Sequence, residues 1–282
     1  LEKWNLKDAN KNSLTGKSLS KYFRDATGNL GTLVDANHLF LRSVYNDDGH
    51  YYYYDSGYNA ASYNAATKKF EVYEELVTSQ VNNSFPFRQR GNFLPFNTYV
   101  DPLVANTNNL YAANGDKLPE SDPKYQEPLY VSRQTTKFSF GMEVSSRFIQ
   151  DENGYTENNP MRYEFTGDDD LWVYIDGVLV LDIGGSHGAR EGYIDFSTGE
   201  VYVQGKGKTT IKKRFEEAEK ADDIEWKSVE YTDSDNKKQT GYIFSDYTSH
   251  EFKMWYMERG GGASNLRIKF NLPVIPQNQI QI

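Results

Sequence analysis

The chain has 282 residues, a formal net charge of −9 at pH 7 and no cysteine. The lack of cysteine excludes a disulfide framework, an iron–sulfur cluster, a thiolate zinc site and a cysteine nucleophile. The acidic balance, without a large basic cluster, argues against binding to nucleic acid or to an anionic membrane, and the length suits one large, elaborated β domain.

Tyrosine and phenylalanine are abundant, with 22 and 16 residues, and together with frequent Asn, Gly and Thr they are typical of an extracellular β protein. The sequence starts at Leu1 without methionine, and it contains neither a signal peptide nor an apolar run long enough to span a membrane. We therefore expect an excised fragment of an extracellular protein, in which residues 276–282 form a linker to a following domain.

The N-terminal third contains a predicted hairpin, a predicted short strand and a long loop region. Residues 1–37 are polar and mixed, and we expect an extension that wraps the edge of a sandwich. From Leu39 a strand-like run, an acidic turn ending at Gly49 and the four tyrosines Tyr51–Tyr54 predict a hairpin. Alternation lets only two of these tyrosines share a face, so a sugar-stacking role competes with core packing. A short strand at 69–76 is followed by a proline-rich loop region at 82–132, either functional or decorative.

A central hairpin is predicted from Leu171 to Leu181, because two β-branched and aromatic runs flank Asp176-Gly177. A two-residue turn places Ile175 opposite Val178, Val173 opposite Val180 and Leu171 opposite Asp182. One face then carries Leu171, Val173, Ile175, Val178 and Val180, and the other carries Trp172, Tyr174, Leu179 and Leu181. Since both faces are apolar, the hairpin is predicted to be buried.

The same register brings an acidic group to the open end of this hairpin. Its members are Asp168, Asp169, Asp170 and Asp182, beside the Gly184-Gly185 loop. Close carboxylates repel one another unless a cation lies among them, and oxygen ligands without cysteine favour Ca²⁺ over zinc. The alternative is a solvated acidic turn, since Asp and Gly are common in ordinary turns.

The C-terminal part adds strands and one helix. A strand at 137–148 and another at 161–165 precede the central hairpin, and Ser197-Thr198-Gly199 joins a further pair. Residues 211–221 predict the helix, 226–244 a hairpin, and 250–259 with 264–272 a last strand pair. Ten or more short strands and one short helix, with long loop insertions, predict an all-β antiparallel β-sandwich.

The segment GDDDLWVYIDGVLVLDIGGSHG, with EGYIDFSTGEVYV and FKMWYMERGGGASNLRIKFNL after it, closely resembles the fibro-slime domain, a relative of the protective-antigen-type lectin-like β-sandwich. YYYYDSGYNAASYN and GNFLPFN look similar to segments of cell-wall-anchored adhesins of Gram-positive bacteria. The resemblance covers about residues 38–275. It implies a single adhesin domain over residues 1–275 of an extracellular, cell-wall-anchored protein.

The resemblance also implies a calcium site, because an Asp-Asp pair joined by a cis peptide binds Ca²⁺ in the flocculin branch of the family. The implied metal ligands are Asp168, Asp169, Glu258 and the carbonyls of Gly260 and Gly262. The implied ligand contacts are Asp170, Asp182, Arg259 and Asn265. Asp170 departs from the family, which commonly has glycine or a small residue there, and the sugar-specifying side chains of the flocculins have no match.

The resemblance therefore predicts a non-enzymatic adhesin that binds a glycan or a host surface component through loops around Ca²⁺. The alternative is a structural or tip module of a surface fibre or pilus that binds a host matrix protein, with purely structural Ca²⁺. Glu258 and Asp169 could be cast as a glycosidase pair, but no catalytic pattern surrounds them. The histidines lack metal-ligand spacing, and only His187, in the glycine-rich loop, lies near the acidic group.

Overall fold

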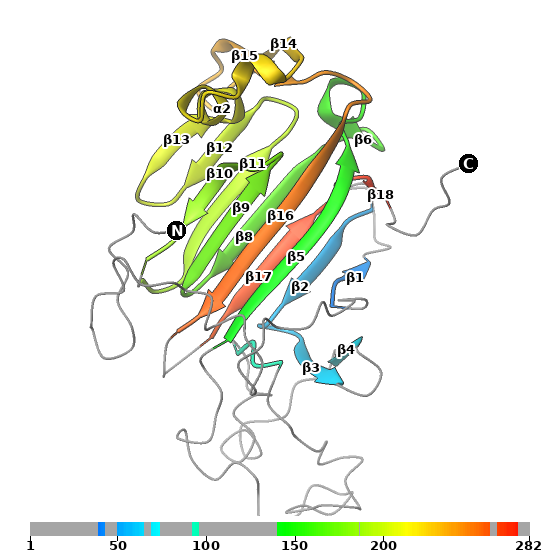
Figure 1. Cartoon of the computed structure of the whole chain (residues 1–282), viewed down its shortest axis with the longest axis vertical. Helices are drawn as coiled ribbons and strands as arrows, with labels where there is room; N and C mark the ends of the chain where they lie inside the picture. Colours follow the sequence, from blue (N-terminus) through cyan, green and yellow to red (C-terminus); the bar gives the residue numbers. More distant parts are fainter. Residues whose placement is uncertain are drawn as a thin grey trace, which may run out of the picture.

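The computed structural model describes residues 39–42, 50–64, 69–73, 92–95, 140–185, 187–259 and 264–275. These residues form two antiparallel sheets, one of seven strands and one of five, which lie one behind the other in Figure 1. The predicted all-β antiparallel sandwich is therefore confirmed.

In each sheet, as ordered below, every strand is hydrogen-bonded to the strands named before and after it. The seven-stranded sheet contains β1 (Leu41–Arg42), β2 (Tyr52–Asp55), β17 (Leu266–Phe270), β8 (Arg162–Gly167), β11 (Arg190–Asp195), β12 (Glu200–Val203) and β13 (Gly207–Thr210). The five-stranded sheet contains β10 (Val178–Ile183), β9 (Asp170–Ile175), β16 (Ser249–Glu258), β5 (Phe140–Ile149) and β18 (Val274–Ile275). Two short pairs are β3 (Ala60–Asn64) with β4 (Lys69–Tyr73), and β6 (Tyr155–Thr156) with β7 (Asn159–Pro160) after the 3-10 helix η4 (Glu152–Gly154).

The core lies between the sheets, because alternate residues of each strand point inward. On β16 the inward residues Phe252, Met254 and Tyr256 are buried, and Tyr163 on β8 meets Phe252 at 5.2 Å between ring centroids. Each buried aromatic side chain removes roughly 150–250 Å² from water, so such residues dominate the stabilisation of this core.

The central hairpin forms as predicted, but its register changes after two pairs. Val178 lies opposite Ile175 and Leu179 opposite Tyr174; a β-bulge at Val180 then places Leu181 opposite Val173. The predicted pairing of Val173 with Val180 is therefore wrong. One extra residue in a strand reverses the faces of those after it, so Leu181 joins the core.

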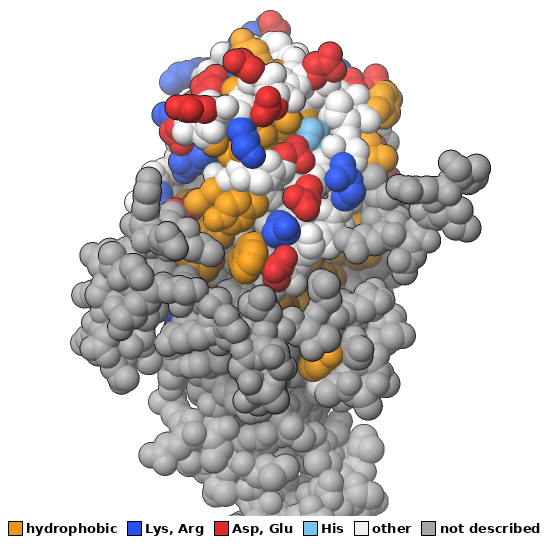
Figure 2. All heavy atoms as spheres, in the orientation of Figure 1, with side chains coloured by type: hydrophobic (Ala, Val, Ile, Leu, Met, Phe, Trp, Pro, Cys, Tyr) orange, Lys and Arg blue, Asp and Glu red, His pale blue; other side chains and the backbone are white. Residues whose placement is uncertain are grey.

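The opposite face of the five-stranded sheet carries a smaller apolar cluster. Trp172 and Met257 are buried in it, and Tyr174, Leu179 and Trp255 pack against them. Figure 2 shows this side of the molecule, where hydrophobic side chains lie among charged ones. Because these residues alternate with core residues, both faces of β9 are apolar, as predicted.

Two other sequence expectations are tested by the strand pairing. β1 pairs with β2 as predicted, and in the tyrosine run only Tyr54 is fully buried in the core. The predicted pairing of the last two strands is wrong, because β16 lies in the five-stranded sheet and β17 in the seven-stranded sheet. Their connection crosses between the sheets.

An insertion between β13 and β16 lies at one end of the sandwich, at the top of Figure 1. It contains α2 (Ile211–Glu217), the 3-10 helix η5 (Ala221–Asp223), and the hairpin of β14 (Trp226–Thr232) and β15 (Lys238–Phe244). The helix is shorter than predicted, because Glu219 takes a left-handed conformation at φ 56° just after it. Within the described part of the chain, no helix combines the length and apolar character needed to cross a membrane.

Several expectations fall outside the described residues. These are the extension at 1–37, the linker at 276–282, and the loop region at 82–132 apart from residues 92–95.

Candidate functional site

The described residues of three connections between the sheets lie together at the end of the sandwich opposite the insertion. Residues 168–169 join β8 to β9, residues 184–189 join β10 to β11, and residues 259–265 join β16 to β17. The first two residues of the predicted acidic run thus form a crossover, and Asp170 begins β9. Asp169 turns the chain at φ 59°, a left-handed conformation that Asp tolerates better than most residues. We call this end of the sandwich the acidic end.

Asp170 and Arg259 form a buried ion pair at the acidic end. The distance from Arg259 Nε to Asp170 Oδ2 is 2.5 Å, and the two side chains are 2% and 0% exposed. The backbone N–H of Gly185 donates to Asp170 Oδ1 at 2.5 Å. Burial raises the pKa of Asp170 to about 6, although Arg259 and Gly185 both act against this rise. The ion pair therefore links all three crossovers.

Asp168 and Asn265 form a second link between crossovers. The backbone N–H and side-chain amide of Asn265 donate to the Asp168 carboxylate at 2.5 and 2.7 Å, and Asp168 N–H donates to the Asn265 carbonyl at 3.2 Å. Burial raises the pKa of Asp168, only partly offset by the Asn265 hydrogen bond. Asp169 accepts a hydrogen bond from Arg259 N–H at 2.5 Å. Every aspartate of the run thus bonds to the loop after β16.

A buried polar chain continues from this loop into the core. Tyr256 Oη donates to Glu258 Oε2 at 3.5 Å and lies 3.4 Å from Ser264 Oγ. Ser264 Oγ donates to the Phe93 carbonyl at 2.7 Å, and Asn92 Oδ1 accepts from Ser264 N–H. Residues 92–95 are therefore attached to the acidic end.

The structure brings together most, but not all, of the predicted site residues. Asp168, Asp169, Asp170, Glu258, Arg259 and Asn265 meet at the acidic end. Asp182 does not join them, because the bulge places it opposite Trp172, where it pairs with Lys206 at 3.2 Å. Gly260 and Gly262 lie outside the described residues. His187 bonds its own loop, with Nε2 2.9 Å from the Ile183 carbonyl.

The described residues do not fit the calcium shell implied by the resemblance. The carboxylates of Asp168, Asp169 and Asp170 accept hydrogen bonds from N–H groups of the protein, and the Asp168–Asp169 peptide is trans. A guanidinium already lies against Asp170. Among the side chains that the structure describes, no group of three or more His, Cys, Asp or Glu has an arrangement that could hold a metal ion.

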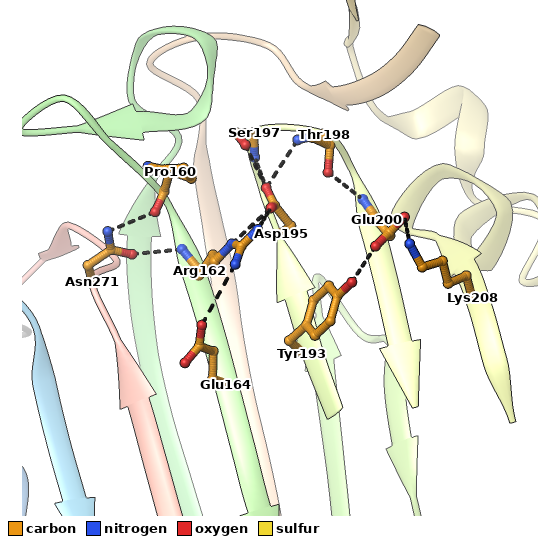
Figure 3. Close-up of polar contacts among 10 residues, drawn as sticks. All are labelled: Pro160, Arg162, Glu164, Tyr193, Asp195, Ser197, Thr198, Glu200, Lys208 and Asn271. Atoms are coloured by element: carbon orange, nitrogen blue, oxygen red, sulfur yellow. Dashed lines mark hydrogen bonds and ion pairs between the residues drawn. The ribbon is translucent and has the colours of Figure 1, made fainter. Parts of the chain in front are cut away.

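Sequence reasoning missed a polar network on the outer face of the seven-stranded sheet, drawn in Figure 3. The Arg162 guanidinium bonds Asp195 at 2.7 Å, and Asp195 also accepts from the Ser197 and Thr198 backbone at the β11–β12 turn. On the other side, Asn271 links β17 to Arg162 N–H and to the Pro160 carbonyl.

The same network extends across β12 to the sheet edge. Tyr193 donates to Glu200, which also pairs with Lys208 on β13 at 3.0 Å. Only Asp195, two residues before Ser197, gave a sequence signal, because Asp often bonds the backbone of its own turn. Because the members of the network bond one another, we interpret it as a brace across five neighbouring strands, from β17 to β13, and not as a binding site.

Comparison with known proteins gives relatives that share short stretches with this chain. It is 40% identical over 74 residues to protein psiF of Dictyostelium discoideum, which is 26% of this chain and 9% of psiF. It is 57% identical over 35 residues to psiG, covering 12% and 5% of the two chains, and 31% identical over 104 residues to psiB, covering 36% and 17%. The matches thus span less than a fifth of these curated relatives. No family model and no solved structure matches the chain.

These comparisons correct the identification made from sequence. The assignment to a fibro-slime domain of a Gram-positive, cell-wall-anchored adhesin is wrong, because the proteins that share sequence with the chain are psi proteins of Dictyostelium. The comparisons give no support to the expected calcium-binding, carbohydrate-binding, adhesin, pilus or cell-wall character. The chain is similar to a short part of each of several psi proteins.

Proposed function

We propose that this chain is a non-enzymatic recognition domain, with the three crossovers of the acidic end as its binding surface. The observation that carries the proposal is the buried Asp170–Arg259 ion pair, which ties these crossovers together. Binding residues are often found on loops held by a rigid scaffold. An extracellular location stays a prediction from composition.

The energetics of the ion pair support a positioning role. Removing two charges from water costs several kcal/mol per ion, and a well-packed apolar pair of similar volume is often as stable. A buried pair is therefore a poor way to increase stability alone, but it sets the positions of the elements that carry it. Here Arg259 also donates its backbone N–H to Asp169, so one residue positions two crossovers.

Burial also argues against the glycosidase alternative. Two catalytic carboxylates must face a bound substrate from both sides of the bond that breaks. Glu258 is 0% exposed and Asp169 is 8% exposed, and both bond protein groups. Neither carboxylate is open to a substrate in this structure.

The partner that the acidic end favours is a basic protein surface. Asp168 is the most accessible of the three aspartates, and burial already raises its pKa, so an incoming cation would stabilise its charged form. A glycan partner and a Ca²⁺ cofactor stay predictions from sequence.

The test compares two isosteric variants, Asp168→Asn at the acidic end and Asp182→Asn on the outer face of the same hairpin. Binding is measured on arrays of extracellular matrix proteins and of glycans, at a temperature where both variants are folded. We expect a matrix protein that binds the wild type and Asp182→Asn but loses affinity for Asp168→Asn. Equal binding by all three chains would contradict the proposed surface.

A second candidate function is a purely structural module. It is favoured by the observation that the acidic carboxylates already bond protein N–H groups. In that case Asp168→Asn lowers the melting temperature and no array component binds in an Asp168-dependent way.

A further inference from the structure

His250 lies in the junction between the insertion and the sandwich, at the end opposite the acidic end. It is the second residue of β16 and is 4% exposed. Its ring stacks on Phe244 of β15, with centroids 3.8 Å apart, and lies 5.6 Å from the ring of Phe148 on β5. Phe244 in turn stacks on Trp226 of β14, so the ring of His250 connects the insertion to the sandwich.

Both ring nitrogens of His250 have hydrogen-bond partners. Nδ1 is 2.6 Å from Asp176 Oδ2, in the turn of the central hairpin, and Nε2 is 2.8 Å from Thr248 Oγ1. Thr248 Oγ1 donates to the Ser245 carbonyl at 2.5 Å. A carbonyl can only accept, so the single hydroxyl proton of Thr248 is already used.

All of these contacts carry a proton only when the imidazole is charged. Thr248 Oγ1 must accept from Nε2, and the Asp176 carboxylate must accept from Nδ1, so both nitrogens carry protons. A neutral imidazole has one N–H and leaves one of these two contacts without a proton. The same proton count excludes Thr248 as a nucleophile activated by His250.

The surrounding charges act on the same junction. The Asp176 carboxylate also accepts a hydrogen bond from the Glu251 backbone N–H at 2.8 Å. Burial raises the pKa of Asp176, but the hydrogen bonds from His250 and Glu251 hold it below the usual range. A cavity of about 550 Å³ opens beside the histidine, lined by Asp176, Asp222, Asp223, Ile224, Glu225, Thr248, Ser249 and His250. It gives solvent access to the junction, and its acidic lining favours a cation.

The remaining charged groups around the junction come from other elements. Arg147 of β5 favours the charged form of Asp176. The Glu251 carboxylate is half-buried on β16. Lys220 Nζ lies close to Gly177 in the hairpin turn. Asp222, Asp223 and Glu225 come from η5 and its C-terminal flank. Carboxylates therefore outnumber cations around the ring.

We propose that His250 is a pH-sensitive latch, which holds the insertion at 211–244 against the central hairpin while its imidazole is protonated and releases it when the imidazole is neutral. The contact made by the protonated imidazole is present at low pH and is lost when the imidazole gives up its proton as pH rises. Because the pKa of Asp176 is lowered, its contribution is present above the usual aspartate range and is lost only as pH falls below it. The latch is thus closed at mildly acidic pH.

Hydrogen–deuterium exchange of the whole chain between pH 5.5 and 8 tests the latch, with rates corrected for the intrinsic pH dependence of exchange. Because a hydrogen bond to a charged group is lost, we expect protection of the β14–β15 amides to fall at least about tenfold, or about 1.4 kcal/mol, as pH rises. The strands β8 and β17 should show a smaller change, because near them the pKa of Asp170, about 6, falls within this pH range.

Three variants make the test specific. His250→Gln keeps a hydrogen-bonding side chain without a titrating group and should abolish the pH dependence, while Thr248→Val removes the Nε2 acceptor and should reduce it. His50→Gln is the matched control, since His50 also bonds a carboxylate, that of Glu157, but is exposed. Wild-type protection that does not change with pH, or a pH dependence that survives in His250→Gln, would overturn the proposal. If His250→Gln does not fold, Thr248→Val decides alone.

Discussion

The buried ion pair at the acidic end predicts that replacing Asp170 and replacing Arg259 cost different amounts of stability. Asp170→Asn keeps the volume of the side chain and an acceptor for Gly185 N–H, but it leaves the Arg259 guanidinium buried without its carboxylate. Arginine cannot lose its proton inside a protein, so the charge remains. Breaking a buried pair in this way costs about 3–5 kcal/mol.

Arg259→Met should cost less at pH 7, because the carboxyl that it leaves behind can take up a proton. The pKa of Asp170 is already about 6, so holding this group neutral at pH 7 adds only about 1.4 kcal/mol, the value of one pH unit. With the loss of packing by the arginine stem, we expect a total cost of about 2 kcal/mol, and a smaller cost at pH 5.

Urea unfolding followed by tryptophan fluorescence at pH 7 and pH 5 measures both variants and the double variant. The double variant should lose less stability than the sum of the two single changes, because neither charge is then left alone. A larger cost for Arg259→Met than for Asp170→Asn, or strict additivity, would refute the assignment of a charged, coupled pair.

Two further predictions use other parts of the structure. A chelator should leave the melting temperature unchanged, since protein N–H groups already bond the acidic carboxylates; a Ca²⁺-specific rise in the chelator-treated protein would restore the calcium prediction. Gly199→Ala should destabilise the fold by several kcal/mol, because φ of Gly199 is 74° and the new Cβ would lie 2.2 Å from the Tyr242 carbonyl oxygen. Gly205→Ala, at φ 80°, places its Cβ in open space and should cost only about 1–2 kcal/mol. Thermal unfolding measures both variants, and equal losses of stability would contradict the contact at Gly199.

Local patterns in the sequence predicted most of the strands, because each depends on neighbours a few residues away. Asp176-Gly177 forms a turn through its own backbone preferences, with φ 47° and 75°, so the central hairpin followed from the sequence. The tip of the β14–β15 hairpin and the Ser197-Thr198-Gly199 turn were predicted for the same reason. Alternation likewise predicted two apolar faces for β9.

The bulge at Val180 was not predictable from that pattern, since the residues around it are all apolar and accept either register. Its effect on the site is large, because the one-residue shift turns Asp182 away from the acidic end and leaves it with Lys206. The sequence also could not predict that β16 and β17 belong to different sheets, because strand propensity does not specify a pairing partner. β17 pairs with β8 and β2 instead of β16.

The sequence by itself determined an antiparallel β-sandwich, its turns and a concentration of carboxylates before the central hairpin. Only the tertiary structure decided what those carboxylates contact, because Arg259 and Asn265 follow them by about 90 residues and reach them through a crossover between sheets. Charge in a sequence shows that a partner is needed, whereas the fold determines whether that partner is an ion, a proton or a side chain. At the acidic end it places a guanidinium against Asp170.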